Sequence, residues 1–327
     1  MAAVQTGIYV ELQEGVTWPA WQQLATRAEA LGFDVLACSA HLMPLEAPGG
    51  WSLDVWPVMA ATALWTRSIR FGPAVLPITF YPPAQMARLA AAIDRLSGGR
   101  FELGLGAGRH EGEHRAFGLP FPGHEERLAM LEEAVEVIRL LWSGERVSYP
   151  GRWYRLEGAR AQPTPVRGWL SVGGNSEASL RIAATHADEW STTSASPEDL
   201  AARLRRLDEL AVQAGRPPGA IVRTIMNGTL VGRDEAEVRR RAERTARLVP
   251  RLAGRPAQAI LEGFVREWGW WAGTPEHIAA QAMSAVRMGF GRILFQVYDW
   301  EDVAALDLLA GAVVPRLHAE AVAAAAG

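Results

Sequence analysis

Hydrophobic residues recur along the chain in two alternating patterns. Short runs of consecutive apolar residues, bounded by glycine, proline or polar residues, are typical of strands that are buried on both faces of a sheet. Between these runs, apolar residues recur every three to four positions, which indicates amphipathic helices. The runs predict eight strands, over residues 7–12, 33–38, 69–76, 101–105, 169–173, 188–193, 221–231 and 292–297. The helical pattern covers residues 17–31, 83–96, 125–142, 177–186, 197–214, 234–248, 256–268 and 301–322. A loop and then a helix are expected within 51–65, and a further helix begins within 273–276.

The regular alternation of strands and helices predicts a single (β/α)8 TIM barrel with inserted loops. Residues 143–166 lack a clean period and are expected to form an inserted loop or hairpin. No segment has the composition of an interdomain linker, so residues 1–327 are expected to form one domain. Because such barrels bind ligands over the C-terminal ends of their strands, the residues that follow each strand are the candidates for a site.

Glycines are concentrated around the strand at 101–105. Gly98 and Gly99 are expected to end the preceding helix in a left-handed turn. Gly106 and Gly108 follow the strand, where the missing side chains allow the backbone to approach another group closely.

The run Leu-Ser-Gly-Gly-Arg-Phe-Glu-Leu-Gly-Leu-Gly-Ala-Gly at residues 96–108 resembles the signature of the luciferase-like monooxygenase superfamily of flavin and deazaflavin enzymes. Residues 28–34, ahead of His41, resemble the opening βαβ unit of that family. The resemblance covers nearly the whole chain and is greatest to the oxidoreductases that use coenzyme F420. It implies a bacterial-luciferase-like barrel that transfers a hydride between F420 and a small organic substrate. An FMN-dependent monooxygenase that uses molecular oxygen remains the alternative, since both cofactors share one phosphate site.

A second glycine-containing turn, Gly173-Gly174-Asn175-Ser176, joins a strand to a helix. Free backbone N–H groups and the helix dipole make such a turn suitable for a phosphate. The residues alone also allow an ordinary helix cap by Asn175 or Ser176. The resemblance implies that this turn binds the cofactor's phosphate, with help from Arg109 after the fourth strand.

His41 follows the second strand, where it either satisfies a core hydrogen bond or points into the pocket. The resemblance places it at the family's active-site histidine, which can donate to a ring carbonyl or carry a proton. Val75 and Leu76 match a turn where family members carry a cis peptide behind the cofactor ring, and Leu76 is expected to back that ring. A plain trans loop is the alternative. The family often has Asp at Ala40, and a sugar-phosphate dehydrogenase branch has Trp at Leu45, which argues against a sugar-phosphate substrate.

The run His110-Glu111-Gly112-Glu113-His114 fits His-Glu-x-x-His, in which two histidines one helical turn apart bind zinc. That chemistry needs a helix, which Gly112 and the preceding glycines disfavour. A third ligand at suitable spacing is missing, although His124 is near. We therefore expect a mobile loop over the cofactor and no metal, and keep a zinc metallohydrolase at His110 and His114 as an alternative.

Composition excludes several other classes of protein. The 33 basic residues are all arginine, and the net charge of −3 gives no reason to expect nucleic acid as a partner. A single cysteine, Cys38, excludes an internal disulfide and indicates the cytoplasm. No apolar run suits a membrane span or a signal peptide. The resemblance also implies a homodimer, and it leaves open a cofactor-free binding subunit. The sequence does not identify the substrate.

Overall fold

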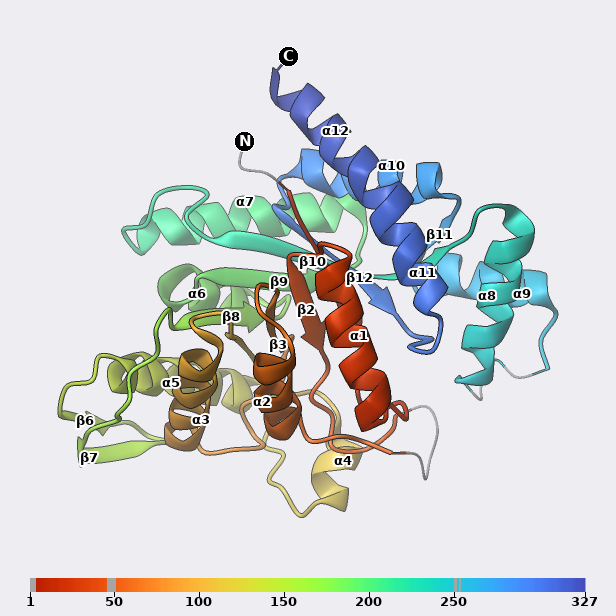
Figure 1. Ribbon diagram of the computed structural model, residues 1–327. Coiled ribbons are helices and arrows are strands. Elements are labelled where there is room, and N and C mark those ends of the chain that lie inside the picture. Colours follow the sequence, from red (N-terminus) through yellow and green to blue (C-terminus); the bar gives the residue numbers. More distant parts are fainter. Residues whose placement is uncertain (1–3, 46–50, 250–251, 253, 327) are drawn as a thin grey trace.

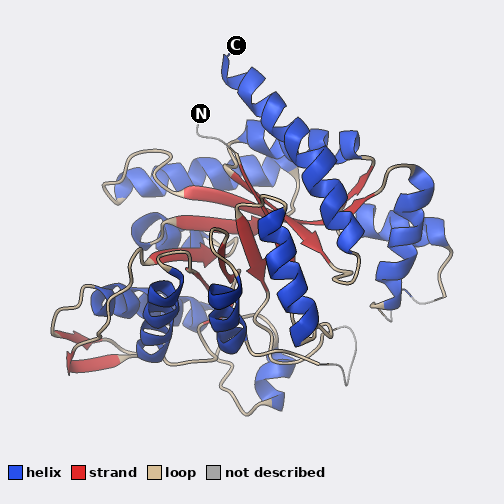
Figure 2. Ribbon diagram, viewed as in Figure 1, coloured by secondary structure: helices blue, strands red, loops and turns tan. Residues whose placement is uncertain are grey.

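Parallel strands form the central sheet of the molecule, and helices cover its outer face (Figures 1 and 2). The computed structural model describes residues 4–45, 51–249, 252 and 254–326. The sheet contains β1 (Gln5–Val10), β2 (Val35–Cys38), β3 (Arg70–Pro73), β4 (Leu76–Pro77), β5 (Glu102–Gly106), β8 (Trp169–Gly173), β9 (Glu189–Thr193), β10 (Val222–Val231), β11 (Trp271–Gly273) and β12 (Arg292–Val297).

The strands follow the order β3-β2-β1-β12-β10-β9-β8-β5-β4, and β11 pairs with β10. A parallel bridge between Phe71 and Phe101 joins the β3 edge to the start of β5, so the sheet is nearly closed into a barrel. The predicted barrel is therefore confirmed. Its eight predicted strands correspond to β1, β2, the β3–β4 pair, β5, β8, β9, β10 and β12.

The third predicted strand is divided in two. A cis peptide bond joins Ala74 to Val75, the two residues that lie between β3 and β4. The resemblance implied a cis peptide at this turn, and the plain trans loop is excluded.

Helices alternate with the barrel strands along the chain, and the last of them follow β12. They are α1 (Trp18–Ala30), α2 (Val55–Trp65), α3 (Pro83–Ser97), α4 (Glu111–Ala116), α5 (His124–Trp142), α6 (Glu177–His186), α7 (Pro197–Gln213), α8 (Glu235–Arg247), α9 (Ala257–Glu262), α10 (Pro275–Met288), α11 (Val303–Leu308) and α12 (Val314–Ala326), with π-helical segments η2 (Gly263–Glu267) and η3 (Leu309–Val313). Gly98 ends α3 with a φ of 70°, as the sequence predicted. Among the described helices, none combines the length and hydropathy that crossing a bilayer requires.

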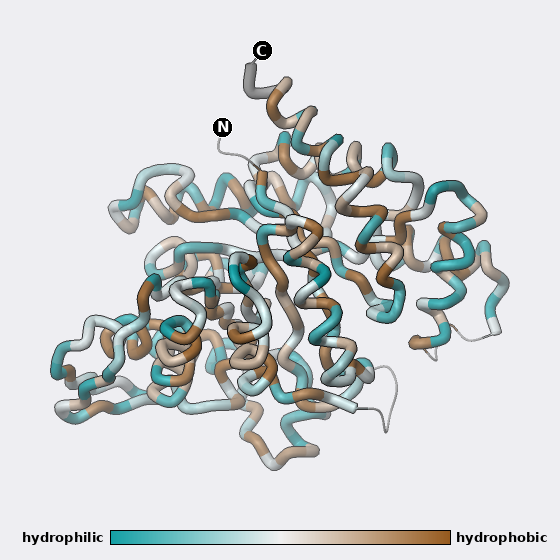
Figure 3. Tube along the Cα trace, in the orientation of Figure 1, coloured by the Kyte–Doolittle hydropathy of each residue, from teal (hydrophilic) through white to brown (hydrophobic). Residues whose placement is uncertain are grey.

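Two features lie outside the regular barrel. The segment 143–166 contains an antiparallel hairpin, β6 (Val147–Pro150) and β7 (Arg155–Ala159), which projects at the lower left of Figure 1. Helices α8 and α9 lie at the opposite side and enclose a small hydrophobic cluster of their own around Phe264 and Trp270. Apolar and polar segments alternate along the helices in Figure 3, as expected for helices with one buried face.

A buried ion cluster occupies the N-terminal ends of the strands. Arg292 is 1% exposed, and its Nη1 lies 2.7 Å from Glu102 Oε2 and 2.5 Å from Glu189 Oε2. Its Nε donates to Gln5 Oε1 at 3.0 Å, and Arg167 Nη1 approaches Glu102 Oε1 to 3.2 Å. These side chains come from β1, β5, β9 and β12 and from the loop before β8, so they connect strands around the barrel.

Candidate functional site

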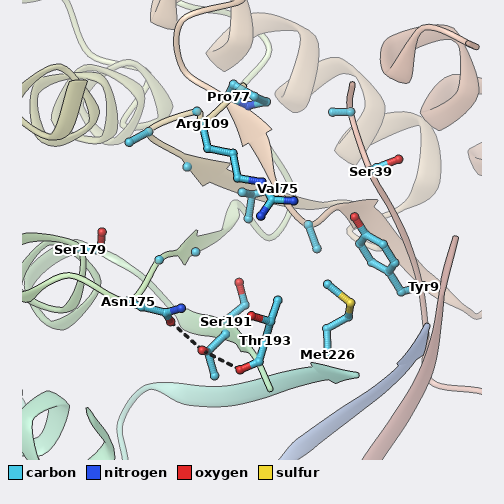
Figure 4. Close-up of a pocket in the computed structure, with 18 of the residues that line it drawn as sticks. Tyr9, Ser39, Val75, Pro77, Arg109, Asn175, Ser179, Ser191, Thr193 and Met226 are labelled. Atoms are coloured by element: carbon cyan, nitrogen blue, oxygen red, sulfur yellow. Dashed lines mark hydrogen bonds between the residues drawn. The ribbon is translucent and has the colours of Figure 1, made fainter. Parts of the chain in front are cut away.

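A cavity of about 760 Å³ opens where the barrel strands end at their C-termini (Figure 4). Its volume lies in the range of small-molecule and cofactor sites. The predicted residues that line it are His41, Val75, Gly106, Gly108, Arg109, Gly173, Gly174, Asn175 and Ser176. The structure therefore brings together in one cavity every predicted site residue except Leu76.

The structure does not place Leu76 where the sequence predicted it, behind the cofactor ring. Its side chain is 0% exposed and belongs to the main hydrophobic core, and it does not line the cavity. Successive residues of a strand point to opposite faces, and in β4 that alternation turns Leu76 inward. Val75 and Pro77 line the cavity on either side of it, so Val75 takes the position that the sequence analysis gave to Leu76.

Glycines around Val75 make room for its side chain. A Cβ on Gly106 would lie 2.6 Å from Val75 Cγ2, and a Cβ on Gly173 would lie 2.8 Å from Val75 Cγ1. Both distances are too short for real contacts, so these positions accept only glycine while Val75 stays in place. Gly106 and Gly173 thus leave space for the side chain of Val75. The sequence predicted that another group approaches these glycines closely, and this valine is one such group.

The turn from β8 into α6 has the geometry of an anion site. Ser176 caps α6, since its Oγ accepts from Ser179 N at 3.2 Å. Gly174 has a φ of 144°, and a Cβ there would lie 2.5 Å from Ser179 Oγ. The Asn175 amide oxygen accepts from Thr192 Oγ1 at 2.6 Å (Figure 4), which fixes that side chain against β9. The helix capping that the residues allowed is therefore present, and the turn also lines the cavity.

Arg109 extends into the cavity between the Val75 turn and the wall that carries Asn175 and Thr193 (Figure 4). Its side chain makes no hydrogen bond or ion pair with any residue that the structure describes. Across the cavity, burial raises the pKa of Tyr9 well above its ordinary value, and the nearby Glu11 carboxylate adds to this, while Arg109 opposes it. A guanidinium without a protein partner, beside bare backbone, fits an anionic ligand.

His41 meets a carboxylate that the sequence analysis did not assign to the site. His41 Nδ1 lies 3.1 Å and 3.2 Å from the two oxygens of Glu113, whose side chain is 1% exposed. The backbone N–H of Leu42 donates to Glu113 Oε2 at 2.7 Å. Burial alone would raise the pKa of Glu113, but the hydrogen bond and charge of His41, together with the Leu42 N–H, outweigh it and lower that pKa.

The expectation of a loop after Arg109 was wrong. Residues Glu111–Ala116 form α4, so a helix does lie under the His-Glu-x-x-His run. His114 is fully buried and uses both ring nitrogens, with Nε2 2.6 Å from Thr79 Oγ1 and Nδ1 2.8 Å from the His110 carbonyl oxygen. Within the described residues, no cluster of three or more His, Cys, Asp or Glu side chains could hold a metal ion.

Several further residues line the cavity that sequence reasoning did not select, namely Tyr9, Glu11, Ser39, Met226, Trp270 and Gln296. Glu11 is held by amides, with Oε1 2.6 Å from Gln296 Nε2 and Oε2 3.0 Å from Gln13 Nε2. The signal that could have found Glu11 is its place directly after β1, because every barrel strand end faces this rim.

Comparison with known proteins places this barrel in a family. The family described as luciferase-like monooxygenase matches residues 3–292, and the chain belongs to it. An F420-dependent hydroxymycolic acid dehydrogenase of Mycobacterium tuberculosis is 31% identical over 304 residues, which cover 90% of this chain and 83% of that protein. An F420-dependent glucose-6-phosphate dehydrogenase of Nakamurella multipartita is 36% identical over 177 residues, which cover 52% of this chain and 51% of the relative. That second match spans about half the length of either protein.

A solved structure supports the same fold. The monooxygenase RslO1 from Streptomyces bottropensis superposes with a TM-score of 0.80 at 24% identity, covering 95% of this chain and 99% of that one. The superfamily, the likeness to its F420-dependent branch and the barrel that the sequence predicted are confirmed.

Proposed function

We propose that this protein is an F420-dependent oxidoreductase that moves a hydride between the deazaflavin ring and a small organic substrate. The observation that carries the proposal is the single cavity that joins His41, the Val75 turn and the Gly173–Ser176 corner. The relatives named as F420-dependent dehydrogenases support F420 over FMN.

The residues around the cavity fit such a cofactor. Gly174 and Ser176 would hold its phosphate through the N-terminal end of α6, and Arg109 would add positive charge. Val75, supported by the surrounding glycines, would lie behind the ring. When bound, F420 supplies a ring that gains or loses two electrons together with hydrogen. His41 would hold or move the proton of a substrate hydroxyl or carbonyl group.

We propose a small alcohol or carbonyl compound as the substrate, and not a sugar phosphate. Leu45 stands where the resemblance places tryptophan in the sugar-phosphate branch. Arg109 is the one arginine among the described residues that line the cavity, and the proposal commits it to the cofactor. The matched part of the Nakamurella relative covers only half of that protein, so its named substrate is not carried over.

Two binding titrations and one reduction assay test the function. We expect F420 to bind at least about tenfold more tightly than FMN, as followed by the fluorescence of each cofactor. We also expect the visible absorbance of oxidised F420 to fall when the loaded protein meets a panel of small secondary alcohols. Tight FMN binding without affinity for F420 would establish the FMN monooxygenase alternative. Binding of neither cofactor would favour a cofactor-free binding subunit.

We further propose that the protein works in the cytoplasm as a homodimer. The single cysteine, which is buried and free, and the family resemblance support these two expectations. Light scattering should then give twice the 35.6 kDa mass of one chain. A particle with the mass of a single chain would refute the dimer.

A further inference from the structure

Glu113 is a buried carboxylate whose contacts are directed at one short segment of the cavity wall. Both of its oxygens lie within 3.2 Å of His41 Nδ1, and Oε2 also accepts from Leu42 N–H. A buried charge is costly unless it is paired and hydrogen-bonded. The pairing partner here is a histidine that lines the cavity, so the carboxylate and the cavity are coupled through that ring.

Helix α4 is anchored so that it presents Glu113 to this segment. At its start, His110 Nδ1 accepts from Glu113 N–H at 3.2 Å. At its other side, His114 is fixed to Thr79 Oγ1 and to the His110 carbonyl, and its ring packs between Phe80 and Phe121 at centroid distances of 5.0 Å and 4.6 Å. The two histidines of the His-Glu-x-x-His run therefore anchor α4. The helix in turn holds the carboxylate of Glu113, the second glutamate of the run, beside His41.

The carboxylate decides which ring nitrogen of His41 carries hydrogen. An ionised carboxylate accepts hydrogen bonds and cannot donate them. His41 Nδ1 must then be the protonated nitrogen of the neutral ring. Nε2 makes no hydrogen bond with any described residue, and His41 lines the cavity, so this nitrogen is left for a ligand.

We propose that Glu113 is a positioning residue that locks His41 in the tautomer with hydrogen on Nδ1, so that Nε2 offers its lone pair to a hydroxyl group in the cavity. When the hydroxyl is deprotonated, its O–H bond breaks and an Nε2–H bond forms. The resulting imidazolium then lies beside the Glu113 carboxylate, which stabilises its charge. The contact of Nε2 with substrate rests on the proposed function, whereas the tautomer does not.

Replacing Glu113 with glutamine should move the hydrogen of the neutral His41 ring from Nδ1 to Nε2. A glutamine offers one acceptor oxygen and one NH2 donor, whereas the site presents two donors, His41 Nδ1–H and Leu42 N–H. The backbone N–H cannot change, so the glutamine oxygen accepts from Leu42 and its NH2 faces His41 Nδ1. That nitrogen must then become the acceptor, which moves the hydrogen to Nε2. A comparable amide substitution beside a serine protease histidine lowers kcat by roughly 10⁴-fold through the wrong tautomer.

The experiment reads the tautomer directly in the cofactor-free protein. Protein labelled with 15N-histidine is examined by NMR at a pH where the ring is neutral, and the His41 signals are assigned by their loss in a His41→Gln variant. We expect the wild type to carry hydrogen on Nδ1 and Glu113→Gln to carry it on Nε2. The matched control is Glu111→Gln, which changes an exposed carboxylate on the same helix and should leave the wild-type tautomer.

Activity supplies the second readout. In Glu113→Gln we expect kcat to fall on the order of 10²-fold or more, while the Kd for F420 and the KM change less than about threefold. A wild-type ring with hydrogen on Nε2 overturns the proposal whether or not Glu113→Gln folds. A Glu113→Gln protein with the wild-type tautomer, or with the kcat of Glu111→Gln, also overturns it. If the tautomers are as expected but wild-type protein binds no F420, the proposed function fails and the positioning role stands.

Discussion

The side chain of Val75 fits into the site because two of its neighbours are glycines and have no side chain. Gly106 and Gly173 leave the space that its two methyl groups occupy. Arg109 has the opposite role, because it brings a charge that no described residue neutralises. Each of these roles predicts a separate effect of substitution.

Replacing Arg109 with methionine should weaken F420 binding roughly tenfold to a hundredfold, since hydrogen bonds to charged groups contribute about 1.5–3 kcal/mol. The dissociation constant measured by fluorescence titration checks this. Arg115→Met, an exposed arginine on α4, is the control and should bind normally. Equal affinities for both variants would show that Arg109 does not contact the cofactor.

Replacing Gly106 with alanine should lower stability by about 1–3 kcal/mol, because the new Cβ would overlap Val75 and force it to move. Chemical denaturation measures the change. Gly291→Ala adds a methyl group where nothing lies within 4 Å, and it should change stability much less. Equal losses of stability in the two variants would show that Gly106 does not make room for the Val75 side chain.

One carboxylate near the end of α1 stabilises the loop that leads into β3. Glu29 Oε1 accepts from the backbone N–H groups of Arg67, Ser68 and Ile69 at 2.6–3.0 Å. Burial opposes ionisation of Glu29, but these hydrogen bonds outweigh it and lower its pKa to about 2. The end of α1 thereby fixes the loop that leads into β3.

Glu29→Gln should therefore cost about 1 kcal/mol near neutral pH, the difference between charged and neutral hydrogen bonds. Because the folded-state pKa lies below the usual 4.5, the unfolded chain binds more protons between these values. The extra stability of the wild type over Glu29→Gln is fully present above pH 4.5 and is lost as the pH falls towards 2. Denaturation midpoints across this range measure it, with Glu243→Gln as the exposed control. An advantage that does not change with pH would contradict the assignment.

The sequence predicted the barrel strands well, but it missed one short helix and the contacts of individual side chains. All eight barrel strands were found because buried parallel strands appear as apolar runs. Helix α4 was missed because it has six residues with Gly112 inside, so local propensity disfavours it and tertiary contacts of His114 hold it. Glu113 was missed with it, since its role depends on His41, 72 positions earlier. Leu76 was predicted to lie behind the ring together with Val75, because the sequence does not show which of the two neighbouring side chains faces the cavity.

Across the whole molecule, stability and ligand binding lie at opposite ends of the barrel. The Arg292 cluster fills the N-terminal end, and the cavity opens at the C-terminal end, as in other barrels of this kind. The one-domain organisation of residues 1–327 stays a prediction, and a single unfolding transition is the outcome expected for it.

Arg292→Met should destabilise the protein by about 3–5 kcal/mol, because buried Glu189 loses its ion-pair partner and Glu102 keeps only its longer contacts to Arg167 and Arg70. Denaturation midpoints measure the loss, with the exposed Arg287→Met as control. The folded fraction should bind F420 with nearly wild-type affinity. A large loss of affinity in folded Arg292→Met protein would show that the two ends of the barrel are not independent.

A crystal structure of the protein with F420 tests the central claim most directly. We predict that the phosphate lies at the Gly173–Ser176 corner within reach of Arg109, and that the deazaflavin ring lies against Val75 on the side where His41 faces the cavity. A cofactor whose phosphate binds elsewhere, or whose ring lies away from both Val75 and His41, would contradict the account.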